Sequence, residues 1–224
     1  MDNSNCIYQG LCRHECPSTC IQWVEMKYML KHSNIPKAKQ CVHRLKPKEC
    51  DIPAFERLSS IQMDIENFVD NGGVLYIYSK QCGNGKTTWS IKMLLQYFNE
   101  VWDGNGLHTR GIFVNVPSFI MKCKSVISTP DDEFEELRSH LDTVDLVVFD
   151  DVSAIGKVSG FDYTSLYGHI DSRCLQGKAM IFTGNHTPEQ LNEILGDRLA
   201  SRICQGINIE LKGGDMRSWC KSNY

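Results

Sequence analysis

The sequence predicts an α/β protein: a five-stranded parallel sheet flanked by helices, preceded by a small Cys-rich helical module. Five short apolar runs alternate with helical patterns after residue 54, which is typical of a parallel sheet covered on both faces. Six of the eleven cysteines lie in the first 50 residues. The same 50 residues carry eight Lys/Arg against four Asp/Glu, although the whole chain has a net charge of -3. The N-terminal region therefore differs from the rest of the chain in its cysteine content and in its net charge.

Composition narrows the class of protein. With 224 residues, 42% hydrophobic and 23% charged, the chain has the balance of an ordinary globular protein, which excludes disorder as its main state. No run approaches the roughly 18 apolar residues of a membrane span, and the first residues lack a secretory signal pattern. We therefore expect a cytoplasmic protein. The slightly acidic total argues against a broadly basic nucleic-acid coat.

The spacing of apolar residues along the chain predicts where the helices and strands lie. A helix is expected over residues 17–31, a Pro- and Lys-containing linker over 34–53, and an amphipathic helix from Ala54 to the Asn71-Gly72-Gly73 stop. The expected domains are a module at 1–33, the linker, and a core at 54–224. Within the core we expect strands at 74–79, 111–116, 145–149, 178–183 and 207–211, with helices at 86–98, 119–127, 133–141 and 163–175, and two short helices within 188–203.

A phosphate-binding loop is expected between the first core strand and its helix. Residues 79–88 match the last three places of the G-x-x-x-x-G-K-[ST] pattern, although Lys80 stands where the first glycine is expected. Gly83 and Gly85 let backbone N–H groups turn around phosphate oxygens, Lys86 brings positive charge, and the Thr87 hydroxyl suits Mg²⁺. The remaining expected nucleotide contacts are Cys82, Asn84 and Thr88.

Polar residues follow two other strands. Asp150 and Asp151 end the third strand, and Asn185 follows the fourth. If the fourth strand lies between the first and third, all three side chains meet the phosphate loop at the carboxyl edge of the sheet, where open α/β sheets bind ligands. We expect Asp150 to hold Mg²⁺, directly or through water, and Asp151 to orient or deprotonate the attacking water. Asn185 is expected to polarise that water or to touch the γ-phosphate.

These motifs carry a family resemblance. Residues 83–87, 148–151 and 183–185, together with the Gly-Asp-Arg-Leu-Ala-Ser-Arg-Ile run at 196–203, resemble AAA+ ATPases of the DnaC/DnaI helicase-loader type. IstB transposition helpers and DnaA initiators are similar, and the resemblance covers about residues 54–217. It implies a P-loop AAA+ fold in which Asp150 and Asp151 form the Walker B pair and Asn185 is sensor 1. ATP and Mg²⁺ are the implied cofactors.

The resemblance also implies roles for arginines and for partners. Arg202 matches the arginine finger that reaches a neighbouring subunit's γ-phosphate, with Arg198, one turn earlier, as the alternative. Arg217 resembles the arginine of the sensor 2 role, although a full helical lid is not expected. A DnaB-type hexameric helicase, single-stranded DNA and self-association into a ring or spiral are the implied partners. Lys122 and Lys124 lie where related proteins touch single-stranded DNA.

The cysteine cluster suggests a metal. Cys6, Cys12, Cys16 and Cys20 offer four thiolates within fifteen residues, which suits tetrahedral Zn²⁺, and DnaI-type loaders resemble this chain in having a zinc-bound N-terminal module. An iron–sulfur cluster is the alternative metal. The ligand set stays open because His14, Cys41, His43 and Cys50 are also candidates.

Four functions remain in competition. A helicase loader is favoured by the run at 196–203, and an IstB-like transposition helper shares its motifs. A zinc-containing P-loop nucleoside kinase is opposed by Asn185 and the two arginines of that run. A non-catalytic adaptor with a decayed phosphate loop predicts nucleotide binding without turnover.

Overall fold

The computed structural model describes residues 20–40, 45–126, 131–154 and 160–215, except the side chains of residues 161–163. Its centre is a fully parallel five-stranded sheet in the order β2-β3-β4-β1-β5. The strands are β1 (Val74–Tyr78), β2 (Gly111–Asn115), β3 (Leu146–Asp150), β4 (Ala179–Gly184) and β5 (Ile207–Glu210). The expected α/β class is confirmed, and β4 does lie between β1 and β3.

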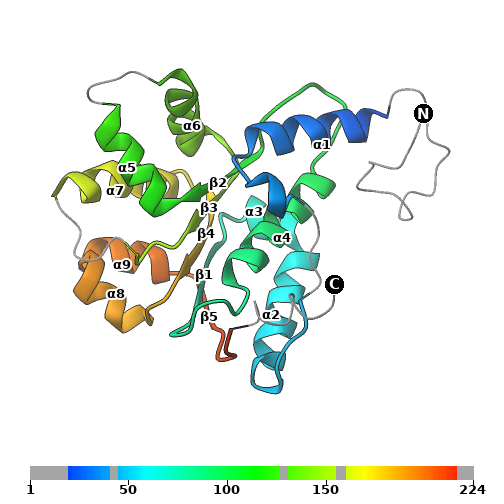
Figure 1. The fold of residues 1–224 in the computed structure, drawn as a ribbon. Coiled ribbons are helices and arrows are strands. Elements are labelled where there is room, and N and C mark those ends of the chain that lie inside the picture. Colours follow the sequence, from blue (N-terminus) through cyan, green and yellow to red (C-terminus); the bar gives the residue numbers. More distant parts are fainter. Residues whose placement is uncertain (1–19, 41–44, 127–130, 155–159, 216–224) are drawn as a thin grey trace.

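Helices cover both faces of the sheet (Figure 1). On one face lie α1 (Ile21–His32), α2 (Ile52–Met63), α3 (Ile65–Asp70) and α4 (Lys86–Glu100). On the other lie α5 (Val116–Ser125), α6 (Asp132–Thr143), α7 (Gly160–Leu175), α8 (Pro188–Leu195) and α9 (Asp197–Cys204). The helix expected from Ala54 is interrupted at Asp64, where the backbone leaves the helical region.

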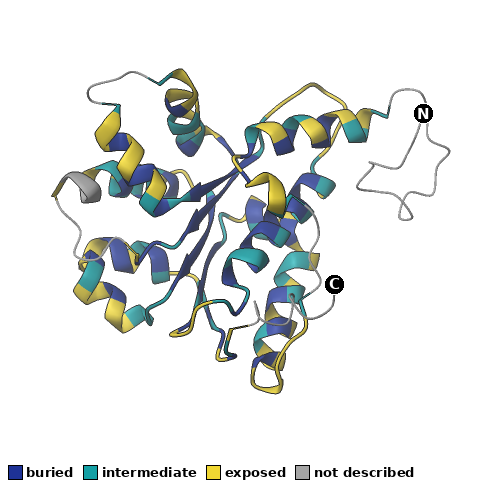
Figure 2. Ribbon diagram, viewed as in Figure 1, coloured by how far each residue is buried: buried dark blue, intermediate teal, exposed yellow. Residues whose placement is uncertain are grey.

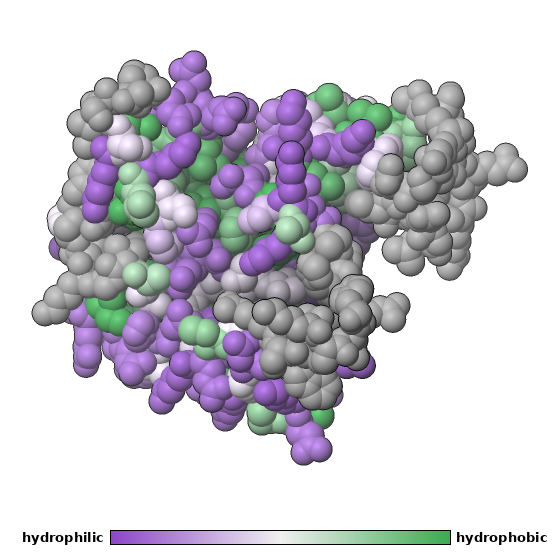
Figure 3. All heavy atoms as spheres, in the orientation of Figure 1, coloured by the Kyte–Doolittle hydropathy of each residue, from purple (hydrophilic) through white to green (hydrophobic). Residues whose placement is uncertain are grey.

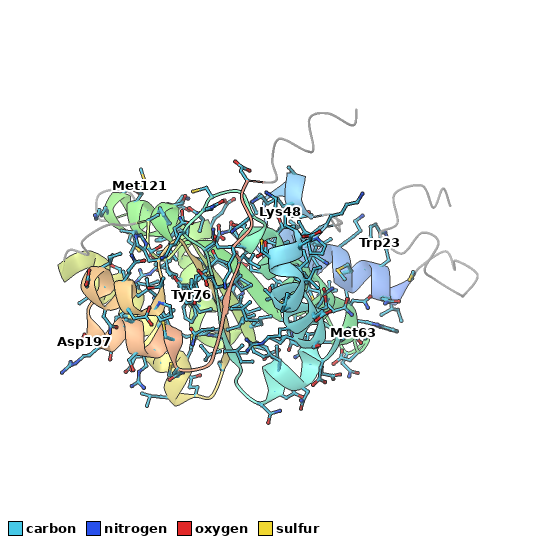
Figure 4. All side chains as sticks on the ribbon, turned by 90° about the horizontal axis from the view of Figure 1, so that it is seen from below. Trp23, Lys48, Met63, Tyr76, Met121 and Asp197 are labelled. Carbon is cyan, nitrogen blue, oxygen red and sulfur yellow. The ribbon has the colours of Figure 1, made fainter. Side chains whose placement is uncertain are left out.

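Alternation along each strand divides the core into two clusters. In β1, Leu75 and Ile77 point to the α1–α4 face, whereas Val74 and Tyr76 point to the other. Because both faces are covered, nearly every residue of β1 to β4 is buried, whereas the edge strand β5 is mostly half-buried (Figure 2). Seen from below, Tyr76 lies near the middle of the molecule, between Asp197 on one side and Met63 on the other (Figure 4).

The outer surface is mostly polar. Hydrophilic residues dominate the face drawn in Figure 3, with hydrophobic residues visible between them, including over α1. Within the described part of the chain, no helix is long and apolar enough to cross a membrane.

The N-terminal helix packs on the α/β core. It begins at Ile21 rather than near residue 17, and Met26 and Met29, each 2% exposed, join the hydrophobic cluster around α4. The next residues bind β2: the Phe113 N–H donates to the Ser33 carbonyl over 2.7 Å, and Asn34 Nδ2 donates to the Phe113 carbonyl over 2.9 Å.

The described part of residues 34–53, the expected linker, makes contacts with the core. Ile35 is buried, and the segment contains two short 3₁₀ turns, at Lys37–Lys39 and Glu49–Asp51. The polar composition of the segment does not predict these contacts, because many of them involve backbone groups. An example is the buried acid Asp51, which accepts hydrogen bonds from backbone N–H groups. The described part of the segment therefore follows the core surface.

A buried arginine ties the α6, α7 and β4 elements together. Arg173 of α7 is 0% exposed, and its Nη1 and Nη2 atoms donate four hydrogen bonds to backbone carbonyls. The acceptors are the carbonyls of Leu141, Val144, Asp145 and Ala179, at 2.8–2.9 Å. Burial lowers the pKa of Arg173 to about 10, so its guanidinium is still charged at neutral pH.

Replacing this guanidinium is expected to destabilise the fold. Arg173→Met keeps much of the side-chain length but leaves four carbonyls without a donor, so we expect a loss of about 3–5 kcal/mol in the free energy of unfolding. Urea unfolding followed by circular dichroism measures this. The matched control is Arg138→Met, whose exposed pair with Glu135 should contribute at most about 0.5 kcal/mol. Equal effects of the two changes would contradict the role of Arg173.

Candidate active site

The phosphate loop connects β1 to α4. Gly83 and Gly85 have φ of 76° and 99°, the left-handed region that favours glycine, and Gly85 caps the N-terminus of α4. Lys80, at the place of the first pattern glycine, needs no such conformation: among described non-glycine residues only Asn34 and Asp151 have positive φ. The departure from the pattern at Lys80 therefore costs the loop no backbone strain.

The side chain of Lys86 is hydrogen-bonded to the phosphate loop. It is 8% exposed, and its Nζ donates to the Gln81 carbonyl over 3.0 Å and to Asn84 Oδ1 over 3.3 Å. Asn84 is fully buried, and its Nδ2 donates to Ser79 Oγ and, over 3.2 Å, to the Leu211 carbonyl. The phosphate loop is thus hydrogen-bonded to the residue that follows β5.

Asp150 bridges two strands and the loop helix. Its Oδ1 accepts hydrogen bonds of 2.7 Å from both the Thr87 and Thr183 hydroxyls. Carboxylate and hydroxyl oxygens are ligands that Mg²⁺ accepts, and both belong to side chains expected to hold it. The donor chemistry of Thr87 and Asp150 therefore fits a magnesium ion.

Asp151 has a left-handed backbone conformation, which is unusual for a residue other than glycine. Its φ is 62°, its N–H donates to Thr183 Oγ1 over 3.0 Å, and its Oδ1 accepts from Asn185 Nδ2 over 3.2 Å. Left-handed backbone at a non-glycine residue is costly and is found where the surrounding structure enforces it, often at functional sites. Here the enforcing neighbours are Thr183 and Asn185 at the end of β4.

The environment of Asp151 favours a proton acceptor. Burial is the main factor that raises the pKa of its carboxyl, and the charge of Asp150 adds to that effect. Lys86 and His186 act in the opposite direction. A carboxylate with a raised pKa is a stronger base than a free aspartate, which suits a group that orients and deprotonates water.

These groups surround one cavity of about 480 Å³. All the expected loop residues line it, together with both acids and Asn185. Three lining residues were not expected from the sequence: Thr183, and Lys39 and Leu45 from the segment before α2. Thr183 lies one step from the Gly184-Asn185 signal, whereas nothing local to Lys39 and Leu45 marks them as site residues.

The expected arginines lie elsewhere. Arg202 projects from α9 and pairs with Asp171 of α7, with Nη2 to Oδ1 at 2.9 Å and Nε to Oδ1 at 3.0 Å. Arg198, on the same helix, is exposed. Neither lines the cavity of its own chain, and Arg217 lies outside the described residues.

The expected metal ligands are mostly outside the described residues. This applies to Cys6, Cys12, Cys16, Cys41 and the two histidine candidates, His14 and His43. Of the remainder, Cys20 is half-buried as the N-cap of α1 and Cys50 is exposed. Across residues 20–40, 45–126, 131–154 and 160–215, no group of three His, Cys, Asp or Glu residues is placed to hold a metal ion.

Comparison with known families decides the relationship. The model of the bacterial DnaA ATPase domain matches residues 63–210, which is more than half of the chain and includes the loop, both acids and Asn185. The chain belongs to the bacterial DnaA ATPase domain family. In agreement, it is 24% identical over 112 residues to the chromosomal replication initiator protein DnaA of Streptococcus agalactiae. That match covers 50% of this chain and only 24% of DnaA.

Solved structures share the fold of this DnaA-family chain. A putative primosome component from Streptococcus pyogenes gives a TM-score of 0.62 at 19% identity, covering 85% of this chain and 98% of that one. The DnaC helicase loader gives 0.59 at 20% identity, covering 76% and 94%. The replication initiator DnaA bound to AMPPCP and single-stranded DNA gives 0.58 at 21% identity, covering 73% and 47%.

We expect Lys86 to act mainly in nucleotide binding and Asp151 mainly in hydrolysis. Lys86→Ala removes the positive charge from the loop, and we expect ATP affinity to fall about 100-fold. Asp151→Asn keeps an acceptor for Asn185 but removes the base, so turnover should fall about 100-fold or more while ATP affinity changes little. Fluorescence titration with a labelled ATP analogue and phosphate-release assays measure the two effects.

Lys92→Ala is the control for Lys86→Ala. Lys92 is on the same helix, but its Nζ lies over the Trp89 ring at 4.3 Å and does not line the cavity. It should bind ATP as the unchanged protein does. Equal losses of affinity in Lys86→Ala and Asp151→Asn would contradict the division of roles.

Proposed function

We propose that this protein is an ATP-driven loader that delivers a DnaB-type hexameric replicative helicase onto single-stranded DNA at the initiation of replication. The observation that carries the proposal is the single cavity in which Lys86, the Thr87–Asp150 pair and the Asn185–Asp151 pair meet, in a member of the DnaA ATPase family. The fold shared with the DnaC helicase loader supports a loader.

Each group in the cavity has a defined task in ATP hydrolysis. Lys86 and the N-terminus of α4 attract the β- and γ-phosphates, because both present positive charge to the loop. Thr87 and Asp150 would hold Mg²⁺, which would neutralise phosphate charge. Asn185 fixes the Asp151 carboxylate by a hydrogen bond, and Asp151 orients and deprotonates the attacking water.

The charge that stabilises the transition state comes from a second subunit in this proposal. The described residues that line the cavity include two lysines, Lys39 and Lys86, and no arginine. Arg202 is instead presented on α9, with its orientation set by Asp171. An arginine supplied in trans makes hydrolysis depend on assembly, so self-association and turnover are coupled.

Arg202→Ala is expected to bind ATP normally but to hydrolyse it at least about 100-fold more slowly, because the finger acts in the transition state. Mixing it with Lys86→Ala protein should restore activity, since one protein supplies the loop and the other supplies the arginine. Phosphate release at several mixing ratios measures the rescue. Absence of rescue at every ratio contradicts the shared site, and the defect appearing in Arg198→Ala instead would transfer the role to Arg198.

The N-terminal region is the proposed helicase contact. Cys6, Cys12, Cys16 and Cys20 remain the proposed ligands of one Zn²⁺, supported by their density and by the likeness to DnaI-type modules. Lys122 and Lys124 on α5 remain the proposed contacts to DNA. Contacts between lysines and phosphates release counterions, so this binding is expected to weaken as the salt concentration rises. Lys122 also pairs with Asp131 at 2.6 Å, and a phosphate would have to replace that partner.

The decisive experiment uses the full chain, a DnaB-type helicase and a circular single strand. We expect the chain to bind the helicase and to place it on the circle only with ATP, whereas Lys86→Ala binds the helicase without placing it. Zinc content, measured on the same preparation, should be about one ion per chain. A chain that binds no helicase but stimulates a transposase would be a transposition helper, and zinc-free protein with full helicase binding would contradict the proposed contact.

A further inference from the structure

A buried acid outside the cavity lining joins the segment before α2 to the segment after β5. Asp51, directly before α2, is 1% exposed, and its two carboxylate oxygens accept backbone N–H groups beyond β5. Lys212 N–H donates to Oδ1 over 2.6 Å, and Gly213 N–H donates to Oδ2 over 2.9 Å. Burying a carboxylate is costly unless it is hydrogen-bonded, and bonds to a charged acceptor are among the stronger ones.

The segment held by Asp51 is the same one that supports the phosphate loop. Leu211 N–H donates to the Tyr78 carbonyl over 2.8 Å, at the point where β1 ends and the loop begins. The Leu211 carbonyl accepts Asn84 Nδ2, and Asn84 Oδ1 accepts Lys86 Nζ. A continuous series of contacts therefore runs from the start of α2, through residues 211–213, to the charged group of the loop.

We propose that Asp51 is a positioning residue for the ATP site. It fixes residues 211–213 against the phosphate loop and so sets the Asn84 and Lys86 side chains before ATP arrives. The inference rests on the proposed binding of ATP. A loop that is ordered in advance loses less conformational entropy on binding, so the contribution of Asp51 is made to ATP affinity.

The expected effect on kinetics follows from the position of Asp51 outside the cavity lining. Asp51 does not line the cavity and touches neither Asp151 nor Asn185. Its loss loosens the loop equally in the ground state and the transition state, so KM rises while kcat at saturating ATP stays nearly constant. A purely structural role would instead lower the melting temperature and leave the ATP affinity of the folded protein unchanged.

Gly213 gives a way to disturb this contact without touching the acid. A Cβ on Gly213 would lie 2.3 Å from Asp51 Oδ2, although the backbone of Gly213 is not left-handed and suits alanine. Gly214 provides the matched control, because a Cβ there would meet only the ends of two flexible side chains, Gln81 at 3.0 Å and Lys48 at 3.3 Å. Figure 4 shows the segment after β5 running toward Lys48.

The experiment is a double-mutant cycle on the full chain, with ATP affinity, KM and kcat measured for each protein. We expect Gly213→Ala and Asp51→Ala each to weaken ATP binding about tenfold, with kcat within about twofold of the unchanged protein. Gly214→Ala should behave as the unchanged protein. The double variant should bind ATP no worse than Asp51→Ala alone, because the collision needs the carboxylate.

Thermal unfolding without nucleotide separates folding from positioning. If Asp51→Ala does not fold, Asp51→Asn replaces it, since the amide keeps one acceptor oxygen and removes the other. Unchanged ATP affinity in the folded Gly213→Ala and Asp51 variants would overturn the proposal, as would full additivity in the cycle. If the unchanged protein itself binds no ATP, the proposed function fails, which is a different result from the two above.

Discussion

The position of β4 between β1 and β3 is the constraint on which the site depends. These three strands place functional groups at their carboxyl ends: the phosphate loop follows β1, Asp150 ends β3 with Asp151 directly after it, and Asn185 follows β4. Parallel pairing in this order brings Thr183 within hydrogen-bond distance of Asp150 and places Asn185 against Asp151. A different strand order would keep every motif in the sequence and separate the groups in space.

Local signals in the sequence were enough to predict the sheet and the residues that meet in the cavity. Apolar runs mark the strands and glycines mark the turn of the loop, because these conformations depend on the residues that adopt them. The roles of Arg173 and Asp51 could not be predicted in this way. Their partners lie 6–32 and 161–162 residues away, and no periodicity or motif marks a side chain whose acceptors or donors are backbone groups.

The same reasoning applies to the segment between the expected N-terminal module and the core. Composition over residues 34–53 resembles a linker because it is rich in Pro and Lys, but composition does not report where backbone groups bind. The helix before it has little amphipathic pattern, since both Met26 and Glu25 are buried. The packing of α1 on α4 could not be predicted from the residues of α1 alone, because it depends on a surface formed by distant parts of the chain.

The contacts of Ser33 and Asn34 with Phe113 have a consequence for solubility. β2 is the outermost strand on its side of the sheet. Outward N–H and carbonyl groups of such an edge strand can pair with a strand of another molecule unless something else binds them. At Phe113 both groups are already taken, one by the Ser33 carbonyl and one by the Asn34 amide. The N-terminal segment thus blocks intermolecular strand pairing at the middle of β2, and a protein shortened to the family-matched region would expose these groups and be more prone to aggregate.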